Sequence, residues 1–203
     1  MIAIIDYGAG NLHSVKNALD FLGAESKITG DRGEILAADK VILPGVGAFG
    51  DAMAMLEKKG LSEVVREVKN SGKPLLGICL GLHLMFEESE ETPGVNGIGI
   101  FKGSVRKIPD TGLKIPHIGW NNIKTKENSW LFDGLGDEPY VYFVHSYYAM
   151  PEDDGIISAY TCYGSELSIA VESGNVAAVQ FHPEKSSDVG MKILKNFIER
   201  ENV

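Results

Sequence analysis

The chain has 203 residues, of which 44% are hydrophobic and 23% charged, a composition typical of an ordered globular protein large enough to form a sizeable core. Its formal net charge is −9 and no run of lysine or arginine stands out, which argues against binding to nucleic acid or to an anionic membrane surface. No apolar run approaches the ~20 residues that a membrane helix needs, and the first residues lack the basic region of a signal peptide. Because only two cysteines occur, Cys79 and Cys162, a disulfide framework is not indicated and we expect a reducing cytoplasm.

The first half of the chain alternates between strand-like and helix-like segments. Apolar runs predict strands at residues 2–6, 26–29, 40–43 and 73–78. Leu12, Val15 and Leu19 recur at helical spacing, so residues 11–22 are expected to form a helix that Gly23 ends. Further helices are expected over residues 48–70, with a break near Gly60, and over residues 82–88. Strands that alternate with helices predict a mainly parallel sheet with helices on both faces.

The second half is richer in strands. They are expected at residues 98–108, 118–124, 141–144, 156–161, 167–171 and 177–181, with turn signals at 109–112 and 173–175 among those that separate them. The last segment, residues 187–200, has the apolar spacing of a helix, with Val189, Ile193, Leu194 and Phe197 facing inward. Residues 1–203 are therefore expected to form a single α/β domain in which antiparallel strands extend the parallel sheet.

Cys79 lies in the most informative segment of the chain, Gly77-Ile78-Cys79-Leu80-Gly81, directly after an apolar run. A strand that leads into Gly-X-Cys-X-Gly and then into a helix is the thiol version of the nucleophile elbow, a sharp turn that exposes a nucleophile at the top of a sheet. The two glycines permit the backbone angles and the close packing that this turn requires. A thiolate held at the start of a helix is favoured by the helix dipole, and it can attack a carbonyl.

The thiol needs a base beside it, because a free cysteine is only a few per cent ionised at neutral pH. Five histidines are available: His13, His83, His117, His145 and His182. His182 is the best candidate, because it follows a predicted strand and precedes Pro183, which favours an extended backbone. In an extended chain residues i and i+2 point the same way, so the ring of His182 and the carboxylate of Glu184 are expected to lie together as base and orienting group. The alternative is a strand end with solvated side chains.

Acyl transfer from an amide also requires hydrogen-bond donors for the oxyanion that forms. The backbone N–H of Leu80, the residue after the cysteine, is expected to be one donor. The segment Pro44-Gly45-Val46-Gly47 follows a predicted strand and is well placed to supply a second donor. An ordinary strand-to-helix turn is the alternative, and the loop alone does not decide between the two.

No cofactor is expected. Gly8-Ala9-Gly10 follows a predicted strand, but position 13 is histidine, so the dinucleotide-binding pattern G-x-G-x-x-G is not completed. No phosphate-loop motif occurs in the sequence. His and Cys residues are too scattered for a zinc signature, so no metal is expected either.

Two further features have structural interpretations. Cys162, in a predicted strand, is expected to be a small core residue rather than a second nucleophile. An acidic run is expected to be the solvated end of the helix after the elbow. Its members are Glu87, Glu88, Glu90 and Glu91.

Three motifs together resemble the signatures of the triad (class I) glutamine amidotransferase family. They are Pro44-Gly45-Val46-Gly47, Gly77-Ile78-Cys79-Leu80-Gly81 and Phe181-His182-Pro183-Glu184. Longer motifs are similar to one branch of that family, the glutaminase subunits of imidazole glycerol phosphate synthase in histidine biosynthesis. These motifs lie at residues 6–12, 47–53, 116–121, 142–147 and 181–186, so the resemblance runs from the first predicted strand to the last helix.

The resemblance implies a flavodoxin-like, doubly wound fold and a thioester mechanism. Cys79 would attack the side-chain amide of glutamine. His182, oriented by Glu184, would take the thiol proton and give it to the departing ammonia, and water would then release glutamate. Leu80 and the Val46-Gly47 segment would supply the oxyanion donors.

The same resemblance assigns five residues to the glutamine pocket. They are Gly47, His83, Glu91, Ser146 and Tyr147. His83 departs from the family's pattern, which more often has glutamine at this position. Its contact with the substrate is therefore open, and a plain surface position on the elbow helix is the alternative.

The chain stops soon after its last predicted helix and carries no synthase domain, so a partner is expected to receive the ammonia. The resemblance implies a (β/α)8-barrel cyclase subunit in a heterodimer. Asn11, Trp120, Tyr142 and Lys185 match positions at that contact. Glutaminase activity is expected to be low until the cyclase binds its nucleotide ligand, and the loop at 44–47 is expected to rearrange to present an N–H to the oxyanion.

Three alternatives remain at this stage. One is the glutaminase subunit of pyridoxal phosphate synthase, against which the Pro-Gly-Val-Gly loop and the Tyr-Phe-Val-His-Ser-Tyr segment argue. Another is a redox-sensing module with Cys79 as its sensor, which has no need of the oriented His182–Glu184 pair. The third is a cysteine peptidase on the same scaffold, which a comparison of glutamine with peptide substrates would separate.

Overall fold

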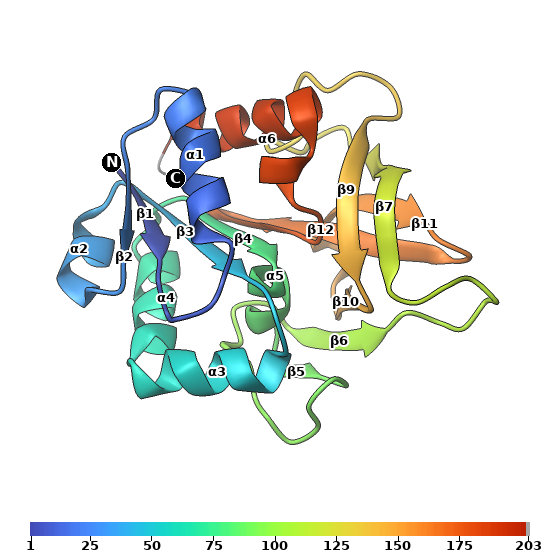
Figure 1. Ribbon diagram of the computed structural model, residues 1–203, viewed down its shortest axis with the longest axis horizontal. Helices are drawn as coiled ribbons and strands as arrows, with labels where there is room; N and C mark the ends of the chain where they lie inside the picture. The colour runs from blue at the N-terminus through green and yellow to red at the C-terminus, as the bar shows by residue number, and fades with distance from the viewer. Residues whose placement is uncertain (202–203) are drawn as a thin grey trace.

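The computed structural model describes residues 1–201 and is built around an eight-stranded sheet with the order β2-β1-β3-β4-β13-β12-β11-β8 (Figure 1). The strands from β2 to β13 in this order pair in parallel, and β12, β11 and β8 extend the sheet with antiparallel pairing. An order that begins 2-1-3-4 is that of flavodoxin-like, doubly wound sheets. The predicted fold class, including the added antiparallel strands, is confirmed.

The strands of the large sheet are β1 (Ile2–Ile5), β2 (Ser26–Thr29), β3 (Lys40–Gly45), β4 (Leu75–Cys79), β8 (Lys124–Thr125), β11 (Ile157–Cys162), β12 (Glu166–Ser173) and β13 (Val176–Val179). Two smaller sheets have the orders β10-β6-β5 and β7-β9. Their strands are β5 (Glu88–Ser89), β6 (Gly103–Lys107), β7 (His117–Asn122), β9 (Tyr140–His145) and β10 (Tyr147–Pro151).

The α-helices are α1 (Leu12–Phe21), α2 (Arg32–Ala37), α3 (Phe49–Lys58), α4 (Leu61–Asn70), α5 (Leu80–Leu84) and α6 (Ser187–Glu199). Two short 3-10 helices are η1 (Asp154–Ile156) and η2 (Pro183–Lys185). Figure 1 shows α1 and α6 above the sheet and α3 and α4 below it.

The two faces of the sheet bury separate apolar cores. Ile2 and Ile4 of β1 belong to the core that also contains residues of α1 and α6. Ala3 and Ile5, which point the other way, belong to the core formed with α3, α4 and α5. Because both faces are covered, the parallel strands are apolar at consecutive positions, which is the pattern that predicted them.

Several element boundaries differ from the predictions. The predicted strand at 98–108 is only β6, because Gly99 has a φ of 72° and the N–H groups of Ile98 and Ile100 donate to carbonyls at the end of α5. The predicted helix at 82–88 is instead α5, which begins at Leu80 and ends at Leu84. The break expected near Gly60 is confirmed, since Gly60 has a φ of 66° between α3 and α4. Helix α2 and strand β10 were not predicted.

The β7–β9 ribbon stands at the side of the large sheet (Figure 1). In its antiparallel register, His117 pairs with His145 and Asn121 pairs with Val141. Between them, Ile118 pairs with Val144 and Trp120 pairs with Tyr142. Side chains alternate between the two faces of a ribbon, so the first two pairs point one way and the other two point the opposite way. His117, Val141 and His145 are buried, whereas Ile118, Trp120 and Val144 are among the exposed large hydrophobic residues. The ribbon therefore has one face in the protein and one in solvent.

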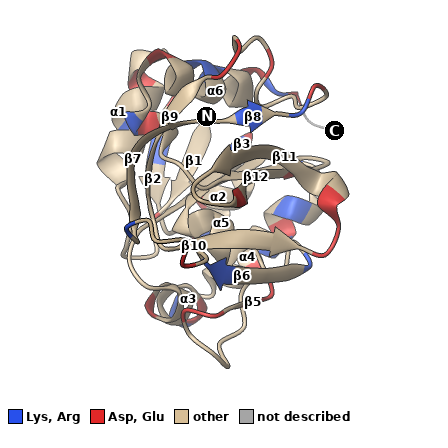
Figure 2. Cartoon of the chain, turned by 90° about the vertical axis from the view of Figure 1, so that its right-hand side faces the viewer, with Lys and Arg blue, Asp and Glu red and all other residues tan. Residues whose placement is uncertain are grey.

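Charged residues of both signs are spread over the surface. Figure 2 shows Lys and Arg scattered among Asp and Glu on the side where β6, β8 and β11 lie. Within residues 1–201, every helix is too short or too polar to cross a membrane.

Candidate active site

Three neighbouring strands of the parallel sheet end side by side. Strand β3 leads into Val46, β4 ends at Cys79, and β13 ends just before Gln180. Gly45 pairs with Cys79 in the register of β3 and β4, and Val179 pairs with Ile78 in the register of β13 and β4. The carboxyl ends of parallel strands are the usual place for a site in an open α/β sheet.

The turn at Cys79 is a strained elbow. Cys79 has a φ of 54° and a ψ of −110°, a backbone conformation that non-glycine residues rarely adopt. A Cβ atom at Gly81 would lie 1.9 Å from the carbonyl oxygen of Leu43, so only glycine allows the chain to pass β3 this closely. A Cβ atom at Gly77 would lie 3.0 Å from Cβ of Ala178. The predicted elbow and the close packing at its two glycines are confirmed, but the unusual backbone angles lie at Cys79 and not at either glycine.

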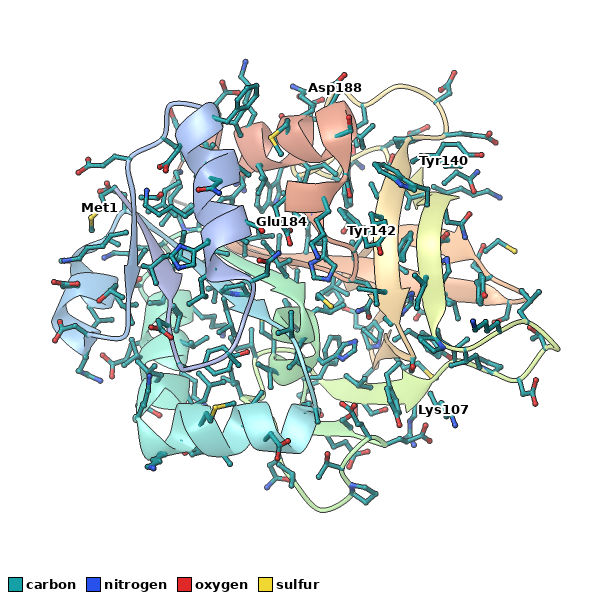
Figure 3. The ribbon with its side chains drawn as sticks, viewed as in Figure 1. Met1, Lys107, Tyr140, Tyr142, Glu184 and Asp188 are labelled. Atoms are coloured by element: carbon teal, nitrogen blue, oxygen red, sulfur yellow. The ribbon has the colours of Figure 1, made fainter. Side chains whose placement is uncertain are left out.

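Cys79, His182 and Glu184 lie together although they are far apart in the sequence. Nδ1 of His182 lies 2.8 Å from Oε1 of Glu184, and both side chains are almost fully buried. Cys79 and His182 line the same cavity, and the interaction with Cys79 raises the pKa of His182. Figure 3 shows Glu184 in the middle of the molecule, between the end of α1 and strand β9. The spatial convergence predicted for these residues is present, and the alternative of a strand end with solvated side chains is wrong, because His182 and Glu184 are buried.

The charge on His182 is favoured by its partners. Burial of the ring lowers the pKa, but the hydrogen bonds with Cys79 and Glu184 outweigh burial and raise the pKa of His182 to about 10. The ring of His182 is therefore protonated at neutral pH, which places an imidazolium beside the sulfur of Cys79. Such a pair holds the sulfur ready as a nucleophile.

A cavity of about 330 Å³ opens beside the sulfur of Cys79. The residues predicted for the glutamine pocket all line it: Gly47, His83, Glu91, Ser146 and Tyr147. The three residues predicted to supply oxyanion donors also line it: Val46, Gly47 and Leu80. The remaining lining residues are Cys79, Pro116, Val144, His145, Gln180 and His182. Their placement is observed, whereas their roles stay predictions.

Glu91 has a structural contact in addition to its place in the cavity wall. One of its carboxylate oxygens accepts the backbone N–H of Phe49, the first residue of α3, at 2.9 Å. The neighbouring N–H of Gly50 donates to the hydroxyl of Thr92. These contacts tie the segment after β5 to the start of α3, close to the loop at 44–47.

The acidic run that contains Glu91 lies beyond the end of α5, so the predicted helix end is wrong, although Glu87, Glu88 and Glu90 are exposed as expected. Glu88 belongs to β5. Glu87 accepts the N–H of Gly103, and Glu90 accepts the N–H of Lys107 and contacts Arg106. These carboxylates therefore help to hold the small β10-β6-β5 sheet together. Their contacts form only after residues 103–107 have folded against residues 87–90, so the sequence alone did not reveal them.

His83 is not a plain surface residue. It is 5% exposed, and its Nε2 atom lies 2.7 Å from Oε1 of Gln180. The amide nitrogen of Gln180 in turn lies 4.0 Å from the sulfur of Cys79. Sequence reasoning missed Gln180, although it stands two residues before His182, and residues i and i+2 of an extended chain point to the same side.

Two further buried histidines adjoin the cavity. Nδ1 of His145 donates to the carbonyl oxygen of Tyr147 at 2.9 Å, so its Nε2 accepts from Nδ1 of His117, 3.0 Å away. Burial lowers the pKa of His117 to about 4 and that of His145 to about 3. Both rings are therefore neutral at physiological pH, and they pack the wall of the site without adding charge.

Cys162 is exposed, so the prediction that it is a small core residue is wrong. It is the last residue of β11, and its side chain points to solvent while the preceding Thr161 is buried. Most residues of β11 are buried on both of its faces, and the sequence did not reveal that this burial stops at the last residue of the strand.

The residues predicted to contact a partner lie on neighbouring elements. Trp120 and Tyr142 face each other across the β7–β9 ribbon with ring centroids 6.2 Å apart. Asn11 directly precedes α1, and Lys185 ends η2, an element that packs against both α1 and β9. Tyr140 and Tyr142 are seen along β9 in Figure 3. The contact itself is not tested by this arrangement.

Within residues 1–201 there is no group of three or more His, Cys, Asp or Glu side chains arranged to hold a metal ion. The cavity itself offers a thiol, imidazoles, a carboxylate and backbone N–H groups.

Comparison with known proteins agrees with these motifs. Residues 3–200 match the family described as "Glutamine amidotransferase class-I". The chain is 52% identical over 98% of its length to a Moorella thermoacetica protein named "Imidazole glycerol phosphate synthase subunit HisH", of which it covers 94%. It is equally similar to the protein of that name from Methanothermobacter thermautotrophicus, with 98% of each chain covered. A solved structure described as "Crystal structure of glutamine amidotransferase" shares the fold with a TM-score of 0.77 at 21% identity, covering 98% of each chain.

Proposed function

This chain belongs to the class I glutamine amidotransferase family, and we propose that it is the glutaminase subunit of an imidazole glycerol phosphate synthase in histidine biosynthesis. The observation that carries the proposal is 52% identity over nearly the whole chain to two proteins of that name, combined with the convergence of Cys79, His182 and Glu184. The names of these relatives favour this role over a glutaminase of pyridoxal phosphate synthesis. A cytoplasmic setting fits the proposal, because Cys79 must stay reduced to act.

The proposed reaction begins with the thiolate of Cys79, which attacks the side-chain carbonyl carbon of glutamine. The C–N bond breaks, His182 gives its proton to the departing nitrogen, and ammonia leaves behind a thioester on the sulfur. Water then attacks the thioester, with His182 accepting its proton, and the C–S bond breaks to release glutamate and regenerate the thiolate. Glu184, 2.8 Å from Nδ1 of His182, keeps the ring oriented through both steps.

The oxyanion formed in each step needs donors near the sulfur. The backbone N–H of Leu80 follows the nucleophile directly, as in other elbows. We propose that the Val46-Gly47 segment supplies the second donor after it rearranges. The exposure of both residues and the open space beside Gly47, whose φ is 97°, support such a movement.

The polar groups of the cavity suit glutamine. Glu91 is the carboxylate that lines the wall, and we propose that it receives the α-ammonium group of the substrate. The rest of the pocket is formed by Gly47, Ser146 and Tyr147, with His83 at its base. Cys79 then faces the amide at the other end of the substrate.

We propose that ammonia passes to a (β/α)8-barrel cyclase bound as a heterodimer. The exposed face of the β7–β9 ribbon supports this, since Ile118 is 56%, Trp120 52% and Tyr140 54% exposed. Large aromatic residues in an exposed apolar patch are typical of protein interfaces. Val144 of the same face also lines the cavity, so the proposed contact borders the place where ammonia forms.

The proposal is tested by measuring glutamate release from the purified chain, alone and with candidate cyclases, in the presence and absence of their nucleotide substrates. We expect slow hydrolysis alone and at least tenfold faster hydrolysis with liganded cyclase. Cys79→Ala should abolish glutamate release while the variant still folds and binds the cyclase. An equal rate of glutamine hydrolysis with and without liganded cyclase would contradict the proposed activation by the partner. Full activity in Cys79→Ala would contradict the assignment of Cys79 as the nucleophile. Cleavage of peptides but not glutamine would favour a peptidase.

A further inference from the structure

Gln180 is a fully buried amide held between Cys79 and His83. Its side chain is 0% exposed, its Nε2 atom lies 4.0 Å from Sγ of Cys79, and its Oε1 atom lies 2.7 Å from Nε2 of His83. It directly follows β13, whose last residue pairs with the residue before Cys79. Two adjacent strands therefore fix the distance between the amide and the sulfur.

The chemistry of the partners decides which way the amide points. A thiolate accepts a hydrogen bond from an N–H group and repels a carbonyl oxygen, so a charged sulfur favours the orientation in which Nε2 faces Cys79. In that orientation Oε1 can only accept, so Nε2 of His83 must carry a hydrogen. A neutral imidazole with its hydrogen on Nε2 meets this need.

His83 is suited to this task because its ring stays neutral. Burial lowers the pKa of His83 to about 4, against the opposing effect of its hydrogen bond with Gln180. The site therefore gains a donor on this side without a second positive charge near His182.

We propose that Gln180 stabilises the thiolate of Cys79 by donating an N–H to its sulfur, and that His83 is a positioning residue that locks Gln180 in the donating orientation. This inference rests on the proposed role of Cys79 as the nucleophile. It adds a donor to the sulfur that is separate from the imidazolium of His182.

Other titratable groups face the same sulfur, and the test has to separate them from Gln180. Cys79 raises the pKa values of His182 and Tyr7, and Glu184 contacts His182. Glu91, His83 and His145 line the cavity. Gln180→Met removes the amide and leaves all of these groups in place, so a changed pH dependence in that variant reports on the amide.

The experiment measures the rate of alkylation of Cys79 by iodoacetamide from about pH 5 to pH 10. A Cys162→Ser background is required, because Cys162 is exposed and would react as well. Gln180→Met has a side chain of similar length but no N–H. We expect alkylation to slow about 3- to 10-fold near pH 6, and the rates to converge near pH 10, where thiols are ionised without help.

Variants at position 83 test the positioning role. His83→Leu leaves the amide free to rotate and should slow alkylation near pH 6 in the same direction as Gln180→Met. His83→Gln should restore the rate, because a glutamine amide can also donate to Oε1 of Gln180. Gln180→Met combined with His83→Leu should be no slower than Gln180→Met alone, because His83 acts only through Gln180.

A folded Gln180→Met variant with the unchanged pH profile would overturn the inference, and so would a double variant slower than the single one. If Gln180→Met does not fold, the comparison of His83→Leu with His83→Gln decides, and equal profiles for these two would overturn it. Alkylation involves no glutamine. Failure of the proposed glutaminase function would therefore give a different result. The unaltered chain would then be alkylated normally at Cys79 but would release no glutamate from glutamine.

Discussion

The hydroxyl of Ser186 donates a hydrogen bond to the carbonyl oxygen of His182 at 2.6 Å. The same hydroxyl accepts the backbone N–H of Tyr142 at 3.0 Å, and the carbonyl oxygen of Tyr142 accepts the N–H of His182 at 3.1 Å. Ser186 is 0% exposed. Ser186 therefore links His182, the proposed catalytic base, to strand β9. The exposed face of β9 carries part of the proposed partner contact.

Ser186→Ala should lower kcat for glutamine hydrolysis about tenfold with little change in KM, because it loosens the backbone of His182 without removing a side chain that lines the cavity. Loss of the hydroxyl leaves the N–H of Tyr142 without its partner, so the free energy of unfolding should also fall by about 1–3 kcal/mol. Steady-state kinetics and urea unfolding measure the two effects.

Ser71→Ala is the matched control, because the hydroxyl of Ser71 donates to a backbone carbonyl, that of Val68, at the end of α4. It should lower stability modestly and leave kcat unchanged. A Ser186→Ala variant whose kcat equals that of the Ser71 control would show that the contact is structural only.

Gly81→Ala should prevent stable folding of the elbow. The added methyl group would lie 1.9 Å from the carbonyl oxygen of Leu43, and backbone atoms of β3 cannot move aside as a flexible side chain can. We expect a loss of about 3 kcal/mol or more in the free energy of unfolding. Gly136→Ala is the control, because no atom lies within 4 Å of the added methyl there, and its effect should stay within about 0.5 kcal/mol. Equal melting temperatures for the two variants would contradict the close approach of α5 to β3.

The main parts of the site could be predicted from the sequence because they depend on local geometry. The elbow at Cys79 needs glycines at fixed spacing, and the pairing of His182 with Glu184 follows from the direction of side chains in an extended chain. The sheet could be predicted because strands buried on both faces are apolar without interruption.

The parts that could not be predicted depend on contacts between distant segments. The environment of His83 is set by Gln180, which is 97 residues away in the sequence. Cys162 was misplaced because only the packing of the folded chain decides that burial along β11 stops before its last residue. The strand expected at 98–108 was too long, because the N–H groups near its start donate to carbonyls at the end of α5 rather than to a strand.

The protein should lose stability as the pH falls from about 6.5 to about 4. Burial lowers the pKa values of His83 and His117 to about 4 and that of His145 to about 3, so between these values and about 6.5 the unfolded chain binds more protons than the folded one. Each neutral ring therefore contributes stability that is present above about 6.5 and is lost on acidification, by up to about 1.4 kcal/mol per pH unit.

His117→Phe tests this linkage while keeping an aromatic ring between Phe143 and Tyr163, on which His117 stacks. The free energy of unfolding, measured with urea between about pH 4 and pH 7, should fall less steeply on acidification in the variant. The difference in slope should correspond to the uptake of about one proton on unfolding. An identical slope would mean that His117 is not neutral in the folded protein.

His182 should have the opposite effect on the alkaline side. Its pKa is raised to about 10 by Cys79 and Glu184, against the effect of burial, so the folded chain keeps a proton that the unfolded chain loses above about 6.5. The stability that this proton contributes is complete below about pH 6.5 and is lost as the pH rises toward 10. His182→Gln should remove this part of the alkaline decline, as measured by unfolding at about pH 7 and pH 9.5. If wild type and variant decline equally, the imidazolium is not held by its two partners.

Trp120→Ala should weaken binding of the cyclase without harming the free chain. Trp120 is 52% exposed and packs edge-on against Tyr142, so its removal costs little packing within the chain. Buried aromatic residues near the centre of an interface often contribute about 2 kcal/mol or more, which is about 30-fold in the dissociation constant. Phe21→Ala is a matched control, since Phe21 is 79% exposed at the end of α1 farthest from Asn11. Calorimetric titration with the cyclase should give a weaker complex for Trp120→Ala alone, and equal affinities for both variants would place the contact away from the β7–β9 ribbon.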